Sequence, residues 1–176
     1  MTNSPKIAIK QYHKDEINTI AIIDNYFITG SSDNSIKCNH YNDGVIFTIE
    51  EAHSDKINYI IKDTINDLNI FSYGSDSFIK YWSIHSYSIE TYYENLLSIN
   101  TNKKVNKCII LINWDLCSCD IDGKINFWEI DNENFNKIKT LTGTKGYMQA
   151  IIEYKDKKLI SGAWGAIEFW DIWIIK

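Results

Sequence analysis

Two segments of the sequence each combine a histidine, a hydroxyl residue and an aspartate, the three groups of a serine-hydrolase triad. The two sets are His13, Thr29 and Asp33, and His53, Ser72 and Asp76. In such a triad the histidine takes the hydroxyl proton while the aspartate orients the imidazole ring. The sequence lacks the Gly-x-Ser-x-Gly elbow that exposes a hydrolase nucleophile. A role other than catalysis must therefore explain why these residue types recur together.

Both sets lie within a longer repeat. Residues 13–20 match residues 53–60 at five of eight places, and each segment is followed by a small, polar cluster, an aspartate and an alternating strand. The pattern then returns twice more. The turn aspartates are Asp33, Asp76 and Asp122, and the tryptophans that end the strands are Trp82, Trp128 and Trp170. A period in the low forties, built of short strands, favours a four-stranded propeller blade over any helical repeat.

Alternating apolar residues and Asn, Asp and Gly turns predict where the strands of each repeat lie. The expected strands are 17–23, 26–30, 35–40 and 45–50; 57–62, 69–74, 78–83 and 89–93; 106–112, 116–120, 124–130 and 137–141; and 149–154, 158–162 and 167–172. Residues 94–104 are expected to form an enlarged connector. Residues 5–12 are expected to form an outer strand that belongs to no complete blade.

This pattern resembles the WD40 repeat family over essentially the whole chain. Two repeats end in the aromatic-Trp-acid sequence of that family, Phe127-Trp128-Glu129 and Phe169-Trp170-Asp171. The resemblance implies an all-β, WD40-type β-propeller of about four four-stranded antiparallel blades. It also implies one domain over residues 1–176, with repeats at approximately 13–52, 53–100, 101–143 and 144–176.

In WD40 blades the equivalent histidine, Ser/Thr, aspartate and tryptophan form a hydrogen-bonded chain that holds the strands together. The resemblance therefore implies a structural tetrad, complete only in the second repeat as His53, Ser72, Asp76 and Trp82. The partial sets are His13, Thr29 and Asp33, with Asn39 in the tryptophan place; Ser118, Asp122 and Trp128, with a residue near Thr101 in the histidine place; and Ser161 and Trp170, with Thr144 in the histidine place and no turn aspartate. We accordingly expect no catalytic residue, no cofactor and no metal site, and hence a protein that is not an enzyme.

The number of repeats leaves the closure of the ring open. WD40 rings usually close with seven blades and occasionally with six or eight, so four repeats cover part of such a ring. The chain could form a small closed ring, completed by residues 5–12, or a partial propeller that another chain or copy completes. A truncated fragment without independent function is a third reading. Because open sheet edges promote association, we expect self-association or a partner.

Composition limits the class of partner and the compartment. All 18 basic residues are lysine, and the formal net charge is −5, so nucleic acid is an unfavourable partner. The sequence has no apolar stretch of signal-peptide length at its N-terminus and none of about 20 residues that would span a bilayer. Cys38, Cys108, Cys117 and Cys119 lack metal or redox spacing. We expect an intracellular protein, cytoplasmic or nuclear, with buried thiols and no membrane partner.

A WD40-type scaffold or adaptor is the function that the resemblance implies. In that family the usual contact surface carries the loops that connect strand d to strand a and strand b to strand c. The candidate partner-facing residues are Lys14, Ser54, Tyr73, Trp114, Tyr147 and Trp164. The tryptophans also keep open a glycan- or small-molecule-binding propeller. The partners that the resemblance implies are other proteins or peptides.

Overall fold

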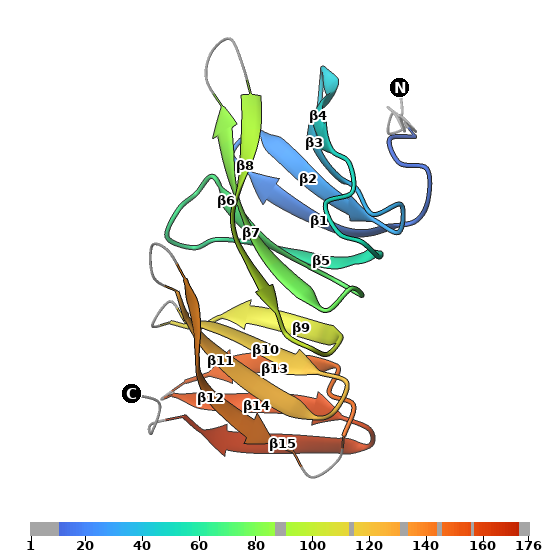
Figure 1. The fold of residues 1–176 in the computed structure, drawn as a ribbon. Helices are drawn as coiled ribbons and strands as arrows, with labels where there is room; N and C mark the ends of the chain where they lie inside the picture. The colour runs from blue at the N-terminus through green and yellow to red at the C-terminus, as the bar shows by residue number, and fades with distance from the viewer. Residues whose placement is uncertain are drawn as a thin grey trace, which may run out of the picture.

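The computed structural model of the chain describes residues 11–86, 91–112, 115–130, 134–143, 146–155 and 157–172. Its regular elements are all strands (Figure 1). They are β1 (Ile17–Ile23), β2 (Tyr26–Ser31), β3 (Ile36–His40), β4 (Gly44–Ile49), β5 (Ile57–Lys62), β6 (Asn69–Gly74), β7 (Phe78–Ser86), β8 (Thr91–Asn100), β9 (Val105–Ile110), β10 (Leu116–Asp120), β11 (Lys124–Ile130), β12 (Phe135–Thr142), β13 (Ala150–Tyr154), β14 (Lys158–Ala163) and β15 (Ala166–Asp171). The described residues include no helix with the length and apolarity needed to cross a membrane.

The strands form four separate antiparallel sheets, each a simple meander in chain order. We call them blade 1 (β1–β4), blade 2 (β5–β8), blade 3 (β9–β12) and blade 4 (β13–β15). Blade 4 has three strands within the described residues. The all-β fold and the four antiparallel blades predicted from the sequence are thus confirmed.

One predicted connector is in fact a strand. Residues 94–104 were expected to be a loop, but β8 continues through Asn100 and pairs with β7 from Phe78↔Asn100 to Ser86↔Thr91. Only residues 101–104 connect blade 2 to blade 3. The prediction failed because β8 is an outer strand whose side chains 93–96 are all exposed, so no apolar alternation marks it. Of the expected outer strand 5–12, Gln11 and Tyr12 have no strand structure and the rest lies outside the described residues.

The core lies between the blades, because successive residues of a strand point to opposite faces of its sheet. We call the face of a blade that is turned toward the next blade in the sequence its forward face, and the opposite one its rear face. In blade 4 the rear face is the one packed on blade 3, and the forward face is the one turned away from it. Ile28, Ile36 and Cys38 on the forward face of blade 1 pack with residues of the rear face of blade 2, among them Ile60 and Trp82. Equivalent apolar clusters join blade 2 to blade 3 and blade 3 to blade 4.

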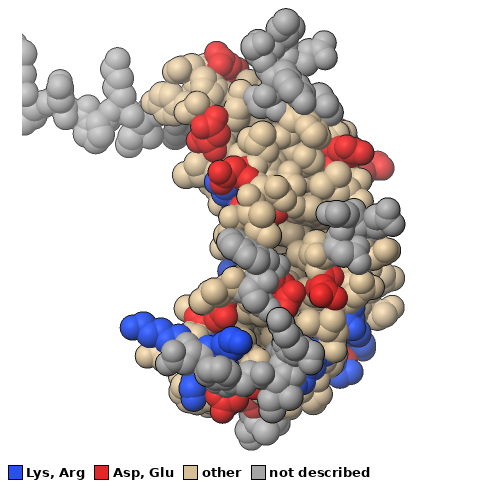
Figure 2. All heavy atoms as spheres, turned by 90° about the vertical axis from the view of Figure 1, so that its left-hand side faces the viewer, with Lys and Arg blue, Asp and Glu red and all other residues tan. Residues whose placement is uncertain are grey.

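The four blades form an open row. Their first strands β1, β5, β9 and β13 contact one another in that order. Blades 1 and 4 lie at opposite ends of the row (Figure 1), and the molecule has the outline of a crescent (Figure 2). The described residues therefore adopt a partial propeller and not a small closed ring.

Candidate functional site

Blade 2 holds a continuous chain of side-chain hydrogen bonds. His53, which is fully buried, contacts both carboxylate oxygens of Asp76 through Nδ1, at 2.9 and 3.0 Å, and Ser72 Oγ through Nε2, at 2.8 Å. Trp82 Nε1 donates to the same Ser72 oxygen at 2.8 Å. The chain connects the loop before β5 to β6, to the β6–β7 turn and to β7, and so holds the strands of the blade in register.

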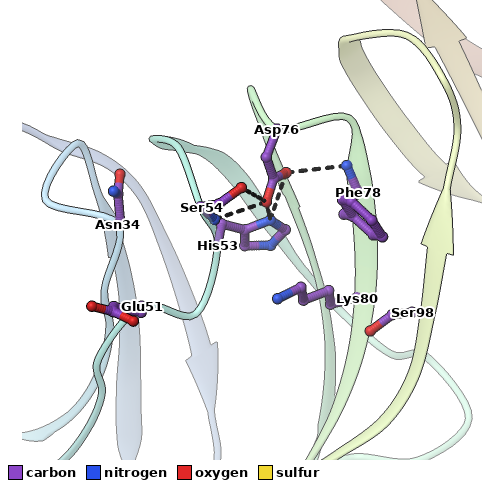
Figure 3. A pocket seen from close by; sticks show the side chains of 8 residues that line it. All are labelled: Asn34, Glu51, His53, Ser54, Asp76, Phe78, Lys80 and Ser98. Atoms are coloured by element: carbon purple, nitrogen blue, oxygen red, sulfur yellow. Dashed lines mark hydrogen bonds and ion pairs between the residues drawn. The ribbon is translucent and has the colours of Figure 1, made fainter.

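The electrostatics of this chain stabilise a carboxylate, not a nucleophile. Burial alone would raise the pKa of Asp76, but His53 and the backbone N–H groups of Phe78 and Ser54 bond to the carboxylate and bring its pKa below the ordinary value (Figure 3). The Ser72 hydroxyl is fully buried and accepts the tryptophan N–H. It therefore has no path to a substrate, and the arrangement is not that of a hydrolase.

Blade 1 builds a similar chain without a tryptophan. His13 contacts Asp33 through Nδ1, at 3.0 and 3.1 Å, and Thr29 Oγ1 through Nε2, at 2.8 Å. Asn39, at the tryptophan position, donates its amide to Thr29 Oγ1 at 3.2 Å. Burial would raise the pKa of Asp33, but the Ser35 side chain and backbone N–H groups outweigh it, so that the pKa falls well below the usual value. An amide here replaces the indole N–H donor.

In blade 3 a different aspartate accepts the backbone N–H groups of the turn between the second and third strands. Trp128 Nε1 donates to Ser118 Oγ at 2.9 Å, but Asp122 is ion-paired with Lys103 at 3.1 Å. The buried carboxylate is instead Asp120, whose Oδ1 accepts the backbone N–H groups of Asp122 and Lys124, both at 2.9 Å. Asp122 is therefore not the tetrad aspartate that its spacing suggested.

The reason lies in the absent histidine. The position of Asp120 is held by Gly74 in blade 2, where an added Cβ would lie 2.7 Å from His53 Nδ1. Thr101, near the expected histidine place, has its hydroxyl oxygen 2.7 Å from the backbone oxygens of Ser77 and Lys103 and donates to one of them. Because no imidazole fills the space, an aspartate side chain can occupy it. The signal in the sequence was the loss of glycine and of histidine in the same repeat.

Blade 4 keeps only the end of the chain. Trp170 Nε1 donates to Ser161 Oγ at 2.9 Å. Its β14–β15 turn is shortened around Gly165, which has a φ of +68°, and carries no aspartate. Thr144 lies outside the described residues.

The loops before each first strand and between second and third strands define what we call the loop face. A cavity of about 530 Å³ opens there between blades 1 and 2 (Figure 3). It is lined by Asn34, Glu51, His53, Ser54, Asp76, Phe78, Lys80 and Ser98. Lys80 donates to the backbone oxygen of Ala52 at 2.5 Å, which joins the strand to the entering loop. The cavity offers polar groups of both charges around one aromatic ring.

A second hollow on the loop face of blade 4 is aromatic. Tyr147, Gln149, Ala163, Trp164 and Gly165 line a volume of about 460 Å³. Trp164 is 86% exposed and Tyr147 45% exposed. The structure thus brings together two residues that the sequence only suggested separately as partner-facing.

The other candidate partner-facing residues differ in their exposure. Lys14 and Ser54 are exposed at equivalent positions, and their backbone N–H groups donate to Asp33 and Asp76. The expectation that Tyr73 faces a partner is wrong: its side chain is buried, and its hydroxyl donates to the backbone oxygen of Asn106 at 3.2 Å. It lies in β6, as the expected strand 69–74 had it, but its ring packs between blades 2 and 3 and does not face a partner. Trp114 lies outside the described residues.

Reactive side chains elsewhere do not converge on a site. The described residues contain no group of three or more His, Cys, Asp or Glu side chains arranged to hold a metal ion. The four cysteines are free and buried, as the sequence predicted. Burial raises the pKa of Cys38 and of Cys119 to about 12, which keeps these thiols protonated at neutral pH.

Comparison with known proteins identifies the fold. No protein-family model and no curated protein matches the sequence. Among solved structures, the WD40 β-propeller domain of Doa1 matches with a TM-score of 0.74 and 21% identity, over 90% of this chain and 51% of that one. A chain of the mitotic checkpoint complex matches with a TM-score of 0.77 and 14% identity, over 92% of this chain and 51% of that one. The chain has the WD40-type β-propeller fold.

The extent of these matches agrees with an open row of WD40 blades. The chain spans about half the length of the Doa1 domain and of the checkpoint chain. The computationally designed Ika4 protein, in contrast, is matched along nearly its whole length, with a TM-score of 0.75, 19% identity and coverage of 96% of this chain and 99% of that one. At these identities the likeness concerns the fold.

Proposed function

We propose that this WD40-type chain is a non-catalytic scaffold that docks protein or peptide partners on its loop face. The observation that carries the proposal is the aromatic hollow of blade 4. Trp164 is the most exposed of the large apolar side chains in the described residues, and it shares its hollow with Tyr147. Tryptophan and tyrosine are the residue types that most often anchor a partner, because they bury a large area at little cost in side-chain entropy.

The hollow stands on a rigid support. Trp164 and Gly165 form the tight turn between β14 and β15, whose pairing continues to Ala163↔Ala166. Tyr147 has a φ of +59°, and its backbone N–H donates to the Ile121 oxygen of blade 3 at 3.0 Å. The backbone of both aromatic residues is therefore held before a partner arrives, which reduces the backbone entropy lost on binding.

The cavity between blades 1 and 2 supports the same function with different chemistry. Glu51, Lys80 and Asn34 supply an anion, a cation and an amide to its lining. Because the chain has no arginine, recognition of a phosphate or carboxylate by a bidentate guanidinium is excluded. A peptide that offers an apolar anchor and ordinary hydrogen-bonding groups suits the loop face better than one selected for a phosphate.

Selection of peptides from a displayed library on the purified chain tests the proposal. Titration of a selected peptide should show at least a tenfold loss of affinity in Trp164→Ala, whereas Ile112→Ala should bind as the wild type does. Ile112 is a matched control, since it is 79% exposed and apolar but lies at the opposite end of β9 from the loop face. Peptide affinities unchanged in Trp164→Ala would contradict docking at the hollow.

A glycan is the second candidate ligand, because an exposed tryptophan and tyrosine can also stack on a sugar ring. Binding on a glycan array that is lost in Trp164→Ala, with no peptide selected, would favour that function instead. We further propose that another chain completes the ring, because the blades form an open row. The Doa1 and checkpoint matches, each about twice as long as this chain, support that proposal.

A further inference from the structure

The forward face of blade 4 is apolar and exposed. Ile152, Ile160, Gly162, Ile167 and Phe169 lie on it, since they are cross-strand neighbours in the β13–β14–β15 register. Ile167 is 68% exposed and Phe169 75% exposed. Blades 1, 2 and 3 carry Ile36, Ile79 and Ile125 at the position of Ile167, and Cys38, Tyr81 and Phe127 at the position of Phe169. None of these side chains is more than 7% exposed. A surface built for an interface between blades thus faces solvent.

The rear face of blade 1, at the other end of the row, shows the same mismatch. Ile17 is 45% exposed and Ile20 is 63% exposed. Blades 2, 3 and 4 carry Ile57, Val105 and Met148 at the position of Ile17, and Ile60, Cys108 and Ile151 at the position of Ile20. None of these side chains is more than 5% exposed. Exposed isoleucines in these positions lose the stabilisation that burial gives every other blade.

The shapes of the two end faces match an interface that already exists within the chain. An added Cβ at Gly30 on the forward face of blade 1 would lie 2.7 Å from Ile57 Cγ2 and 3.1 Å from Ile60 Cδ1 of blade 2. Thr19 of blade 1 itself lies 2.9 Å from the same Cβ, so the facing isoleucine pair and this neighbour together leave room only for glycine. Blades 2 and 3, which face other residue pairs, carry Tyr73 and Cys119 at the glycine position.

Blade 4 carries a glycine again, Gly162, although no neighbour among the described residues requires it. An added Cβ there would meet only the Cβ of Ala150, at an ordinary 3.6 Å. The rear face of blade 1 presents Ile17 and Ile20, the same pair as Ile57 and Ile60. The combination of Gly162 with these isoleucines would reproduce the packing between blades 1 and 2.

A polar contact repeats in the same way. Asn18 Nδ2 donates to the Ile57 backbone oxygen at 2.9 Å, and Asn106 Nδ2 donates to the Met148 oxygen at 2.6 Å. The equivalent residue of blade 4 is Gln149, which also carries an amide and is exposed. The residue of blade 1 equivalent to Ile57 and Met148 is Ile17. A neighbouring blade 1 would therefore offer the Ile17 oxygen to the Gln149 amide.

We propose that the forward face of blade 4 packs against the rear face of blade 1 of a second copy, and reciprocally, so that two crescents close an eight-bladed ring. The two faces lie at opposite ends of one chain (Figures 1 and 2), so a single copy cannot join them. Two copies together have the length of one propeller of the Doa1 type, of which this chain covers 51%. A twofold axis makes both contacts identical and leaves neither end face exposed.

This inference rests on the proposal that another chain completes the ring, and it names that chain. Light scattering coupled to size exclusion on the full chain, over a range of micromolar concentrations, should give twice the 20.5 kDa of one chain. Gly162→Trp should give a single-chain mass, because the indole would fill the space required by Ile17 and Ile20. Ile112→Trp is the matched control. It places the same side chain on blade 3, in the middle of the row, and should remain dimeric.

Three results would overturn the proposal. These are a wild-type chain that stays at the single-chain mass at every concentration, a dimer that persists in Gly162→Trp, and a ladder of larger species in place of a dimer. Should Gly162→Trp fail to fold, Ile20→Lys tests the opposite face, and a dimer that survives this change counts equally against the ring. Peptide binding measured on single-chain Ile20→Lys separates the two proposals, because Ile20 does not line the aromatic hollow, whereas Gln149 belongs both to the hollow and to the proposed contact between copies. Wild-type peptide affinity in this variant would support docking at the hollow without the ring.

Discussion

Replacement of His53 by alanine should lower the free energy of unfolding by about 3–4 kcal/mol. The imidazole makes one hydrogen bond to a neutral hydroxyl, Ser72, and a charge-assisted contact to the Asp76 carboxylate. A neutral hydrogen bond contributes about 1 kcal/mol and one to an ionised group about 1.5–3 kcal/mol. Alanine also leaves a carboxylate in a partly buried site without the partner that compensates its burial. These contributions set the expected loss.

Urea titration followed by tryptophan fluorescence measures this loss at a fixed protein concentration. Trp82 is a suitable probe, because its indole N–H belongs to the same chain of hydrogen bonds. His40→Ala is the matched control. His40 pairs with Asp43, but both side chains are partly exposed, at 26% and 67%, so this change should cost about 1 kcal/mol or less.

A double-mutant cycle with Asp76→Asn isolates the contact between the two residues. The cost of His53→Ala should shrink when residue 76 can no longer ionise, because part of that cost is the loss of a charged partner. If His53→Ala unfolds at the same urea concentration as His40→Ala, the chain of hydrogen bonds does not stabilise blade 2 and the reasoning is refuted.

Three further predictions concern acid, the third blade and the thiols. The pKa of Asp76 is lowered in the fold, so its contribution to stability is complete above the unfolded value of about 3.8 and is lost as pH falls through the lower folded value. Urea titrations across this acidic range should therefore show a steeper loss for wild type than for Asp76→Asn; equal slopes would contradict the assignment. Asp120→Gly removes the acceptor of two backbone N–H groups and should cost about 2 kcal/mol in the same assay, whereas a cost near zero would show that the turn holds without it. Cys38 and Cys119 should react with a chromogenic disulfide reagent at neutral pH only as the protein unfolds, since burial raises the pKa of both to about 12; rapid reaction of the native chain would disprove their burial.

The strands could be predicted because local chemistry repeats. Turns at Asp24 and Gly44 both adopt positive φ, a conformation that Asp and Gly tolerate. The second strands β2 and β10 are buried over most or all of their length, as expected for sheets packed on both sides. The start of β8 was predicted within strand 89–93, but its continuation to Asn100 was not, because the side chains of residues 93–96 are exposed and show no apolar alternation. Tyr73 lies within the predicted strand 69–74, but its side chain occupies the face that is turned toward blade 3, and only the packing of the blades shows that this face is buried.

The hydrogen-bonded chains were predictable only where spacing and geometry coincide. Asp122 has the correct spacing, yet Asp120 accepts the turn N–H groups, because the space that an imidazole would fill is available only when the histidine is absent. Spacing records the position of a residue along the chain and not the volume left by a missing neighbour. The same limit applies to Trp164 and Tyr147, whose shared hollow depends on how two separate loops approach one another.

The open row also determines where the protein loses structure first. Each blade contacts only its neighbours, so its local stability is the sum of its own strands and its adjoining faces, as in other repeat proteins. Blades 2 and 3 have two such faces, and their second strands β6 and β10 are buried along their whole length. Blade 4 has one. Amide hydrogens should accordingly exchange fastest in β15 and slowest in β6 and β10, with opening that begins at the ends and moves inward. Where two copies meet, exchange at β15 would slow as protein concentration rises while exchange at the centre stays constant.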